Sequence, residues 1–439
     1  MGLVVRGTIF QTPTRDRLEV LVDHVVTVGD DGVITYVGPA ADHVGAIDVV
    51  LGDDDYLLPG LIDLHVHAPQ WPQLGTGLDL PLEDWLFSYT FPLESRYVDL
   101  EFAQRVWESM VPRLLREGTT TAVYFSSIHE PATLALAQVC LTAGQRGFVG
   151  RVAMDHPEGT PDFYRDADAS DAVERSHRSI TAIEALDPSG LVRPIITPRF
   201  IPACTDAALE GLGELAEATG ALVQTHCSES DWEHGYVLDR FGVTDTVALE
   251  RFGLARDHSV LAHADHVTHS DQQVLAGLGA GIAHCPLSNS YFANAVLPVR
   301  QVLDNGVRLG LGTDVAGGPD ASILASAGHA VTVSRMLEDG VDPVVAAHDR
   351  ATPDSRIDVV TAFYLATVGG AEVLGLNAGL LEHGHVFDAF VVQTGTGRSV
   401  EVWPEVDDDG RIFEKVVRGA RGTDVSTVWV NGQTVVDAD

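Results

Sequence analysis

The stretch Pro59-Gly60-Leu61-Ile62-Asp63-Leu64-His65-Val66-His67 is an apolar run that ends in two histidines separated by one residue. Side chains alternate between the two faces of a strand, so His65 and His67 lie on the same face, about 6–7 Å apart along the chain. Two imidazoles at that spacing suit one metal ion. The same pair also occurs on solvated surface strands, so the rest of the chain has to decide between the two interpretations.

Three further apolar runs end in side chains that bind metals or transfer protons. These side chains are His226 and Glu229 after residues 221–225, His263 after residues 259–262, and Asp314 after residues 307–313. Polar residues at strand ends are where parallel α/β proteins hold their chemistry. His65, His67, His226 and Asp314 would form a mixed nitrogen and oxygen ligand set with room for a water, which is typical of a catalytic metal site.

Short apolar runs alternate with segments of helical period from residue 61 onward. The expected helices include residues 100–117, 132–143, 171–186 and 206–218. The expected strands are residues 61–67, 119–125, 148–154, 192–199, 222–229, 259–264, 280–285 and 307–314. Eight such alternations predict an α/β fold of the (β/α)8 type, a TIM-like barrel, with its active site at the carboxyl ends of the strands.

Both ends of the chain have a different texture. Residues 3–10, 20–28 and 32–37 are short β-type runs broken by Gly and Asp turns, and similar runs return at 389–393 and 427–436. We therefore expect residues 1–58 and 385–439 to form one small, discontinuous β-sandwich-like domain beside a barrel of residues 59–384. The 439-residue length suits this arrangement better than three small domains.

The formal net charge of −36 excludes an electrostatic nucleic-acid binder, because most of the surface would repel phosphate. An acidic surface with a single lysine, Lys415, fits either a salt-adapted organism or a genome rich in G and C. Lys415 is far along the chain from the barrel strands. A binuclear metal centre bridged by a carboxylated lysine is therefore not expected.

The chain has no apolar run of the roughly 18 residues that a membrane span needs, and its first residues lack a signal-peptide pattern. Its cysteines are Cys140, Cys204, Cys227 and Cys285, and their wide spacing favours free buried thiols over disulfides. We expect a soluble cytoplasmic protein. We also expect it to bind no membrane and no nucleic acid.

These motifs resemble the amidohydrolase superfamily, in its mononuclear zinc deaminase branch. The resemblance is carried by residues 59–67, His226, His263 and Gly312-Thr313-Asp314, and more specifically by residues 312–318, Thr197-Pro198-Arg199-Phe200, Ala283-His284-Cys285-Pro286 and Thr90-Phe91-Pro92. It covers nearly the whole chain. Within the branch, the resemblance is strongest to the members that deaminate guanine.

The resemblance implies one zinc ion per subunit, held by His65, His67, His226 and Asp314. It implies that Glu229, His263 and Asp314 are catalytic. The residues implied to contact substrate are Gln70, Arg199, Phe200, His226 and His263. His284 also ends a strand, but its neighbours Cys285 and Pro286 favour a packed or supporting position.

The implied reaction is zinc-dependent hydrolysis of guanine, a small-molecule purine, to xanthine and ammonia by a homodimeric enzyme of purine catabolism. Residues 290–294 replace a smaller, Ser- and Gly-rich loop, and the residue after His226 is Cys227 where a small apolar residue is more usual. The first departure leaves a pterin, an 8-oxopurine or a triazine open as the substrate ring. A non-catalytic assembly protein is a further alternative, which the intact ligand set and Glu229 disfavour.

Overall fold

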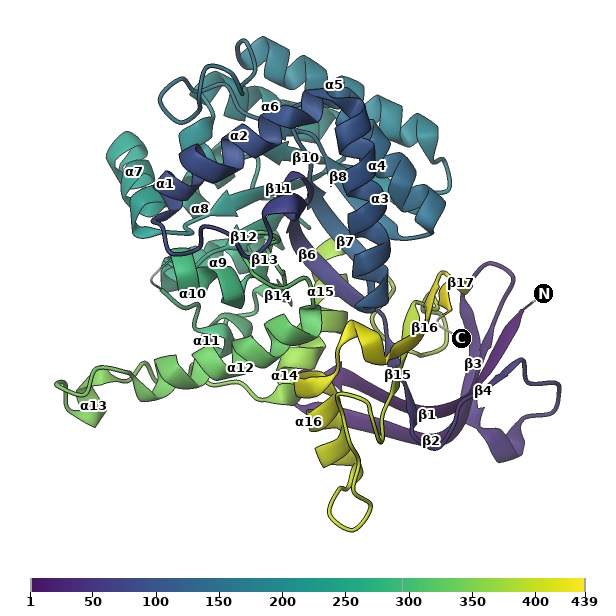
Figure 1. The fold of residues 1–439 in the computed structure, drawn as a ribbon. Coiled ribbons are helices and arrows are strands. Elements are labelled where there is room, and N and C mark those ends of the chain that lie inside the picture. Colours follow the sequence, from purple (N-terminus) through teal and green to yellow (C-terminus); the bar gives the residue numbers. More distant parts are fainter. Residues whose placement is uncertain (1, 294, 438–439) are drawn as a thin grey trace.

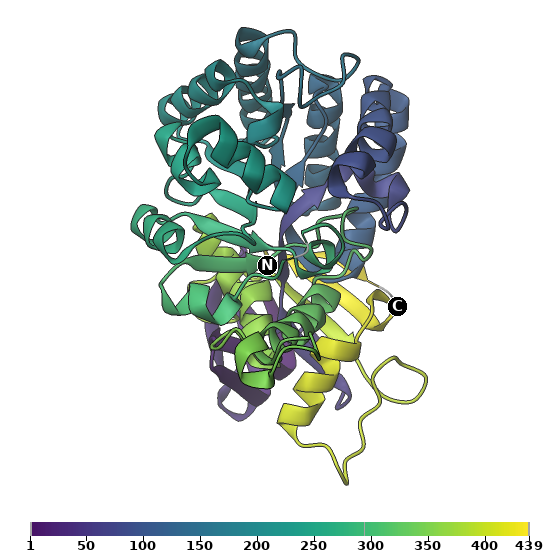
Figure 2. The same ribbon diagram turned by 90° about the vertical axis from the view of Figure 1, so that its left-hand side faces the viewer.

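A computed structural model of the chain describes residues 2–293 and 295–437. Its two parts are visible in Figure 1, where a barrel surrounded by helices stands above a twisted sheet. Figure 2, turned by 90°, keeps the teal and blue barrel helices at one end and the purple N-terminal strands with the yellow C-terminal helix at the other. Distant ends of the sequence therefore lie side by side.

The barrel is a parallel sheet, as the sequence predicted. Its strands, in hydrogen-bonding order, are β6 (Leu61–His67), β7 (Thr119–Phe125), β8 (Arg146–Gly150), β10 (Val192–Pro198), β11 (Leu222–Cys227), β12 (Val260–His263), β13 (Gly281–His284) and β14 (Arg308–Leu311). The short β9 (Val152–Ala153) continues β8 and pairs with β10. A bridge between Val66 and Val315 joins the first strand to the segment after the last, so the sheet closes.

Several strands end earlier than the predicted ranges. The fifth stops at Cys227 instead of residue 229, and the eighth stops at Leu311 instead of residue 314. Ser228 and Asp314 both have a φ of 50°, a left-handed conformation that interrupts the extended backbone of a strand. The chain therefore leaves the sheet just where its polar residues begin.

The four predicted helices are present within two residues of their expected bounds. Asp99 begins the first of them, because its carboxylate accepts hydrogen bonds from the backbone N–H groups of Glu101 and Phe102. The helices are α1 (Leu82–Trp85), α2 (Phe91–Glu94), α3 (Leu100–Arg116), α4 (Glu130–Ala143), α5 (Ala169–Leu186), α6 (Asp206–Thr219), α7 (Asp231–Phe241), α8 (Asp245–Arg251), α9 (His269–Leu278), α10 (Pro286–Phe292), α11 (Val299–Asp304), α12 (Ile323–Asp339), α13 (Ala347–Arg350), α14 (Val359–Tyr364), α15 (Gly370–Leu374) and α16 (Asp409–Gly419). None of those described could span a membrane.

The two chain ends share one sheet, as expected. Its main path runs β17 (Gln433–Asp437), β16 (Val425–Val430), β15 (Ala389–Gln393), β5 (Asp55–Pro59), β1 (Leu3–Thr14), β2 (Arg17–Val28) and β3 (Ile34–Pro39), with β4 (Val49–Val50) paired to β1. Helix α16 packs against this sheet, and the ring of Phe413 meets that of Phe10 edge-on at 5.8 Å. A division into two domains at residues 58 and 385 stays a prediction.

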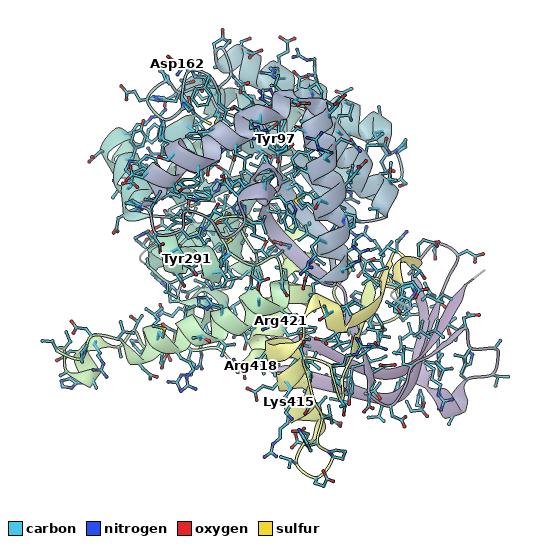
Figure 3. The ribbon with its side chains drawn as sticks, in the orientation of Figure 1. Tyr97, Asp162, Tyr291, Lys415, Arg418 and Arg421 are labelled. Carbon is cyan, nitrogen blue, oxygen red and sulfur yellow. The ribbon has the colours of Figure 1, made fainter. Side chains whose placement is uncertain are left out.

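Lys415 lies on α16, below the barrel in Figure 3. Its ammonium group donates to the Asp407 carboxylate and to the Glu401 carbonyl. The chain's single lysine is thus engaged beside the terminal sheet, far from the strand ends of the barrel.

A buried ion pair fastens the barrel to the terminal sheet. Arg146 of β8 donates through Nε and Nη2 to Asp388, with distances of 3.2 and 3.2 Å to Oδ2. Asp388 Oδ1 also accepts the backbone N–H of Asn431 at 2.6 Å. One carboxylate therefore holds a barrel strand and the turn between β16 and β17.

We predict that Asp388→Asn lowers the free energy of unfolding by about 3–5 kcal/mol, because it leaves the Arg146 charge buried without its partner. Urea denaturation followed by circular dichroism measures this. Asp23→Asn is the matched control. Asp23 pairs with Arg6 at the surface, so removing its charge should change the free energy of unfolding far less than Asp388→Asn does. Equal unfolding midpoints for Asp388→Asn and the wild type would contradict the prediction.

Candidate active site

The four predicted metal ligands converge at the carboxyl ends of the strands. The Nε2 atom of His65 lies 3.2 Å from Asp314 Oδ1, and that of His67 lies 3.6 Å from the same oxygen. His67 Nε2 and His226 Nε2 are 2.9 Å apart. All four side chains are buried, so the cluster is shielded from bulk water.

Backbone pairing across the barrel seam sets this geometry. The N–H of His67 donates to the Val315 carbonyl at 2.8 Å, and the N–H of Asp314 donates to the His65 carbonyl at 2.9 Å. Asp63 adds a side-chain clasp, accepting from the Thr313 hydroxyl at 2.6 Å and the Thr313 N–H at 3.0 Å. The first and last strands therefore carry their ligands as one unit.

The donor set fits a divalent cation. Burial lowers the pKa of His65, His67 and His226 well below the usual value, so these imidazoles are neutral and each can offer a lone pair. Neither ring nitrogen of His65 has a hydrogen-bond partner among the described residues. The close approach of two neutral imidazoles to a carboxylate, with such unpartnered nitrogens, is what a metal ion would satisfy.

The tautomer of His226 is fixed from outside the cluster. Its Nδ1 lies 2.6 Å from the backbone carbonyl of Arg199, an acceptor, so Nδ1 carries the proton. Nε2 is left as the free lone pair that faces His67. Metal-binding histidines commonly have this arrangement, since the outer hydrogen bond orients the ring.

Glu229 and His263 lie beside the cluster. Glu229 Oε1 is 3.7 Å from His263 Nε2, and both side chains are buried. Burial raises the pKa of Glu229 well above its usual range, and the neighbouring Asp314 charge adds to the rise. The arrangement gives one carboxyl group that can hold a proton near neutral pH, which general acid-base chemistry requires.

Two residues that support His263 were not predicted. Asn289 Oδ1 lies 2.9 Å from His263 Nδ1, and Asn289 Nδ2 donates to Asp265 Oδ1 at 2.7 Å. Asp265 therefore orients the amide of Asn289, whose oxygen then receives the imidazole N–H. The only sequence signal was Asp265 itself, two residues after His263.

A cavity opens onto the cluster. Its wall combines apolar and aromatic side chains with a comparable number of polar ones, and three of the polar residues are predicted metal ligands. The lining residues are His67, Gln70, Leu82, Trp85, Leu86, Arg199, Phe200, His226, Glu229, Phe292, Asp314 and Gly317. Aromatic side chains beside several polar groups are typical of a pocket for a small aromatic molecule with polar substituents.

Of the five residues expected to contact substrate, Gln70, Arg199, Phe200 and His226 line this cavity, whereas His263 is not among its lining residues. Arg199 is only 2 % exposed, so it is no surface arginine, although it does form an ion pair. Phe200 is also buried, with its ring centroid 6.1 Å from that of His226. Gln70 lines the cavity in the turn that follows β6.

The partner of Arg199 is Glu94, which sequence reasoning missed. Glu94 closes α2 and is 1 % exposed. It accepts from Arg199 Nη1 at 2.6 Å and from Nη2 at 3.0 Å, a two-pronged ion pair. Its sequence signal was weak, because Glu94 lies two residues beyond the Thr90-Phe91-Pro92 motif and ends no apolar run.

His284 is packed, in line with the expectation for it. It is fully buried, its ring nitrogens have no hydrogen-bond partner within the described part of the chain, and burial lowers its pKa to about 3. The four cysteines are free and buried, as predicted. Of the altered loop, residues 290–293 are described, Phe292 lines the cavity, and Asn294 lies outside the described residues.

The sequence pattern of the amidohydrolase family matches residues 56–435. The chain belongs to the amidohydrolase family. The (β/α)8 barrel, the His and Asp cluster at its strand ends and the small sheet beside it are therefore the amidohydrolase architecture, as the motifs predicted.

Individual amidohydrolases are similar over most of the chain. A probable guanine deaminase of Schizosaccharomyces pombe is 39% identical over 87% of this chain and 71% of its own. A crystal structure of guanine deaminase from C. acetobutylicum with bound guanine in the active site has a TM-score of 0.89 and 27% identity, covering 99% of this chain and all of that one. An adenosine deaminase from Xanthomonas campestris with bound zinc has a TM-score of 0.83 and 25% identity, covering 99% of this chain and 93% of that one.

Proposed function

We propose that this protein hydrolyses guanine to xanthine and ammonia. The observation that carries the proposal is the buried Arg199 in the cavity wall, beside Gln70 and next to Glu229 and the His and Asp cluster. A buried guanidinium in the pocket wall calls for a carbonyl acceptor on the ring, which guanine has at C6 and adenine lacks. The similarity to guanine deaminases supports the same substrate.

We propose one zinc ion per chain, bound by His65, His67, His226 and Asp314. Three neutral imidazoles and a carboxylate are a usual zinc set, and the similar adenosine deaminase binds zinc. When bound there, zinc lowers the pKa of a water molecule toward roughly 7 and so supplies a nucleophile at neutral pH. The other steps fall to side chains of the chain.

Glu229, Asp314 and His263 are the proposed proton carriers. Asp314 accepts a proton from the attacking water as the new C–O bond forms at C2. Glu229 gives its proton to the ring nitrogen next to C2. The proton held by Asp314 then passes to the amine, which leaves as ammonia when the C–N bond breaks, and the proton of the new C2 hydroxyl returns to Glu229 as the carbonyl forms. His263, with its proton held on Nδ1 by Asn289, turns the bare Nε2 toward this exchange.

The ring itself would be held by Arg199, Gln70, Phe200 and His226. Arg199 donates to the C6 carbonyl, and Gln70 meets the ring edge. Phe200, beside His226, offers an aromatic face for stacking.

We further propose a cytoplasmic homodimer. The four free, buried thiols are consistent with a reducing compartment. The segment after α12 projects from the body in Figure 1 and exposes apolar side chains, among them Val341 and Val344, which is 91 % exposed. Such side chains are typical of a contact surface. Light scattering should give twice the chain mass of 46.9 kDa, and a monomer at micromolar concentration would refute the dimer.

For the metal, we predict one zinc per chain by plasma mass spectrometry of protein purified without added metal. His67→Ala should lose the zinc because it removes a ligand from the centre of the cluster. His177→Ala, an exposed histidine of α5, is the control and should keep it. Two tightly bound metals per chain, or zinc retained in His67→Ala, would overturn the assignment.

For the substrate, we predict that guanine has the highest kcat/KM in an ammonia-release assay with guanine, adenine, 8-oxoguanine and a pterin. Adenine should be poorer by up to ~10⁴-fold, because its C6 amine would face Arg199 donor to donor and it has no amine at C2. A higher kcat/KM for a pterin or 8-oxoguanine would mean that residues 290–293 have changed the substrate.

The catalytic control for this assay is Glu229→Gln, a nearly isosteric change. It should keep zinc but lower kcat at least ~100-fold, the usual contribution of a general acid-base group. Glu210→Gln, on the exposed face of α6, should leave kcat unchanged. Full activity in Glu229→Gln would show that the proton takes another route.

A further inference from the structure

Glu94 lies behind the pocket wall and does not line the cavity. It belongs to the segment between β6 and α3, which in Figure 1 crosses the barrel through α1 and α2. The hydroxyl of Tyr97, labelled in Figure 3, fastens this segment to the turn after β6 by donating to the Pro69 carbonyl at 2.8 Å. A side chain in that position can act on substrate only through its neighbours.

Glu94 accepts hydrogen bonds from two different side chains. Besides the two bonds from Arg199, its Oε1 accepts from Gln70 Nε2 at 3.0 Å. The Tyr164 hydroxyl accepts the Ile128 N–H at 3.3 Å, and its pKa is raised by burial and further by the Glu94 charge. A carboxylate accepts and never donates, so this buried hub holds only groups that donate to it.

The hub fixes the polarity of Gln70. A glutamine amide can present either its oxygen or its nitrogen in a given direction, and its surroundings decide which. Here Nε2 must face Glu94, and Oε1 accepts the N–H of Ala316 at 3.2 Å. Gln70 can therefore offer a ring in the cavity one N–H of Nε2 and one lone pair of Oε1, and the positions of these two groups are fixed.

Glu94 also holds Arg199 in place. The carboxylate meets both terminal nitrogens of the guanidinium, whose central carbon lies 4.9 Å above the ring of Phe91. Phe91 and Glu94 are on the same short helix, α2. One turn of chain thus supplies both the face and the anion that orient Arg199.

We infer that Glu94 is the specificity-determining positioning residue of this pocket, setting which ring edge is accepted by fixing Gln70 and Arg199 without touching the ring. This inference rests on the proposed function, since it concerns how the same pocket recognises guanine. The segment that carries Glu94 also gives Leu82, Trp85 and Leu86 to the cavity wall. The same segment therefore supplies both part of the cavity wall and the carboxylate that orients the recognition groups.

Glu94→Gln tests the inference, because the amide keeps the size but directs an NH2 group at one of the former donors. With Gln70 free to turn, kcat/KM for guanine should fall about 100-fold, mainly through KM, and the preference for guanine over 8-oxoguanine and pterin should shrink at least about tenfold. A residue that only stabilises the fold would lower the yield or the melting temperature and leave this ratio unchanged.

Asp388→Asn is the matched control. It also removes the charge from a buried carboxylate bonded twice to an arginine, but at the junction with the terminal sheet. It should lose stability and keep the wild-type substrate ratio. A substrate ratio that shifts equally in both variants would overturn the inference, because general loosening would then explain it.

Glu94→Asp decides the question if Glu94→Gln does not fold. The aspartate keeps the charge for Arg199 but is one methylene too short to reach Gln70 as well. Glu94→Asp should raise KM for guanine and reduce the preference for guanine over 8-oxoguanine and pterin. Wild-type ratios in the folded Glu94 variants would refute the inference alone, whereas a wild-type enzyme that is inactive on guanine would refute the proposed function.

Discussion

The closure of the barrel is the constraint on which the site depends. His65 and Asp314 are almost 250 residues apart, yet a backbone hydrogen bond of 2.9 Å joins them directly. The Asp63 clasp on Thr313 reinforces the same seam. Because the sheet closes only with all its strands in register, the distances between the metal ligands depend on the register of every strand.

The site buries ionisable side chains, which costs free energy of solvation, and two kinds of local arrangement offset that cost. Histidines and acids of the cluster are buried, and burial drives each toward its neutral form: the pKa of Asp314 rises to about 6 while that of His65 falls. Arg199 shows the other solution, since Glu94 opposes the effect of burial and keeps the arginine charged. One pocket thus holds neutral lone-pair donors on one side and a paired cation on the other.

The sequence was informative where chemistry coincides with periodicity. His65, His67 and Asp314 could be predicted because each ends an apolar run, and eight such runs define a barrel. Glu94 and Asn289 could not, because they lie in short helices between strands and their partners come from distant segments. The fifth strand also ends earlier than predicted, because hydrophobic periodicity carries no signal for the left-handed backbone at Ser228.

The pairing of β5 with β15 has a consequence for biosynthesis. Strand β5 leads straight into the strand that carries His65, and its second edge is filled by residues 389–393 from near the end of the chain. Residues 389–393 are made more than 300 residues after β5, so that edge of β5 has no partner during most of translation. Contacts between such distant segments form slowly, and an unpaired edge invites association between nascent chains. The sheet beside the barrel is therefore completed only after all eight barrel strands have been made.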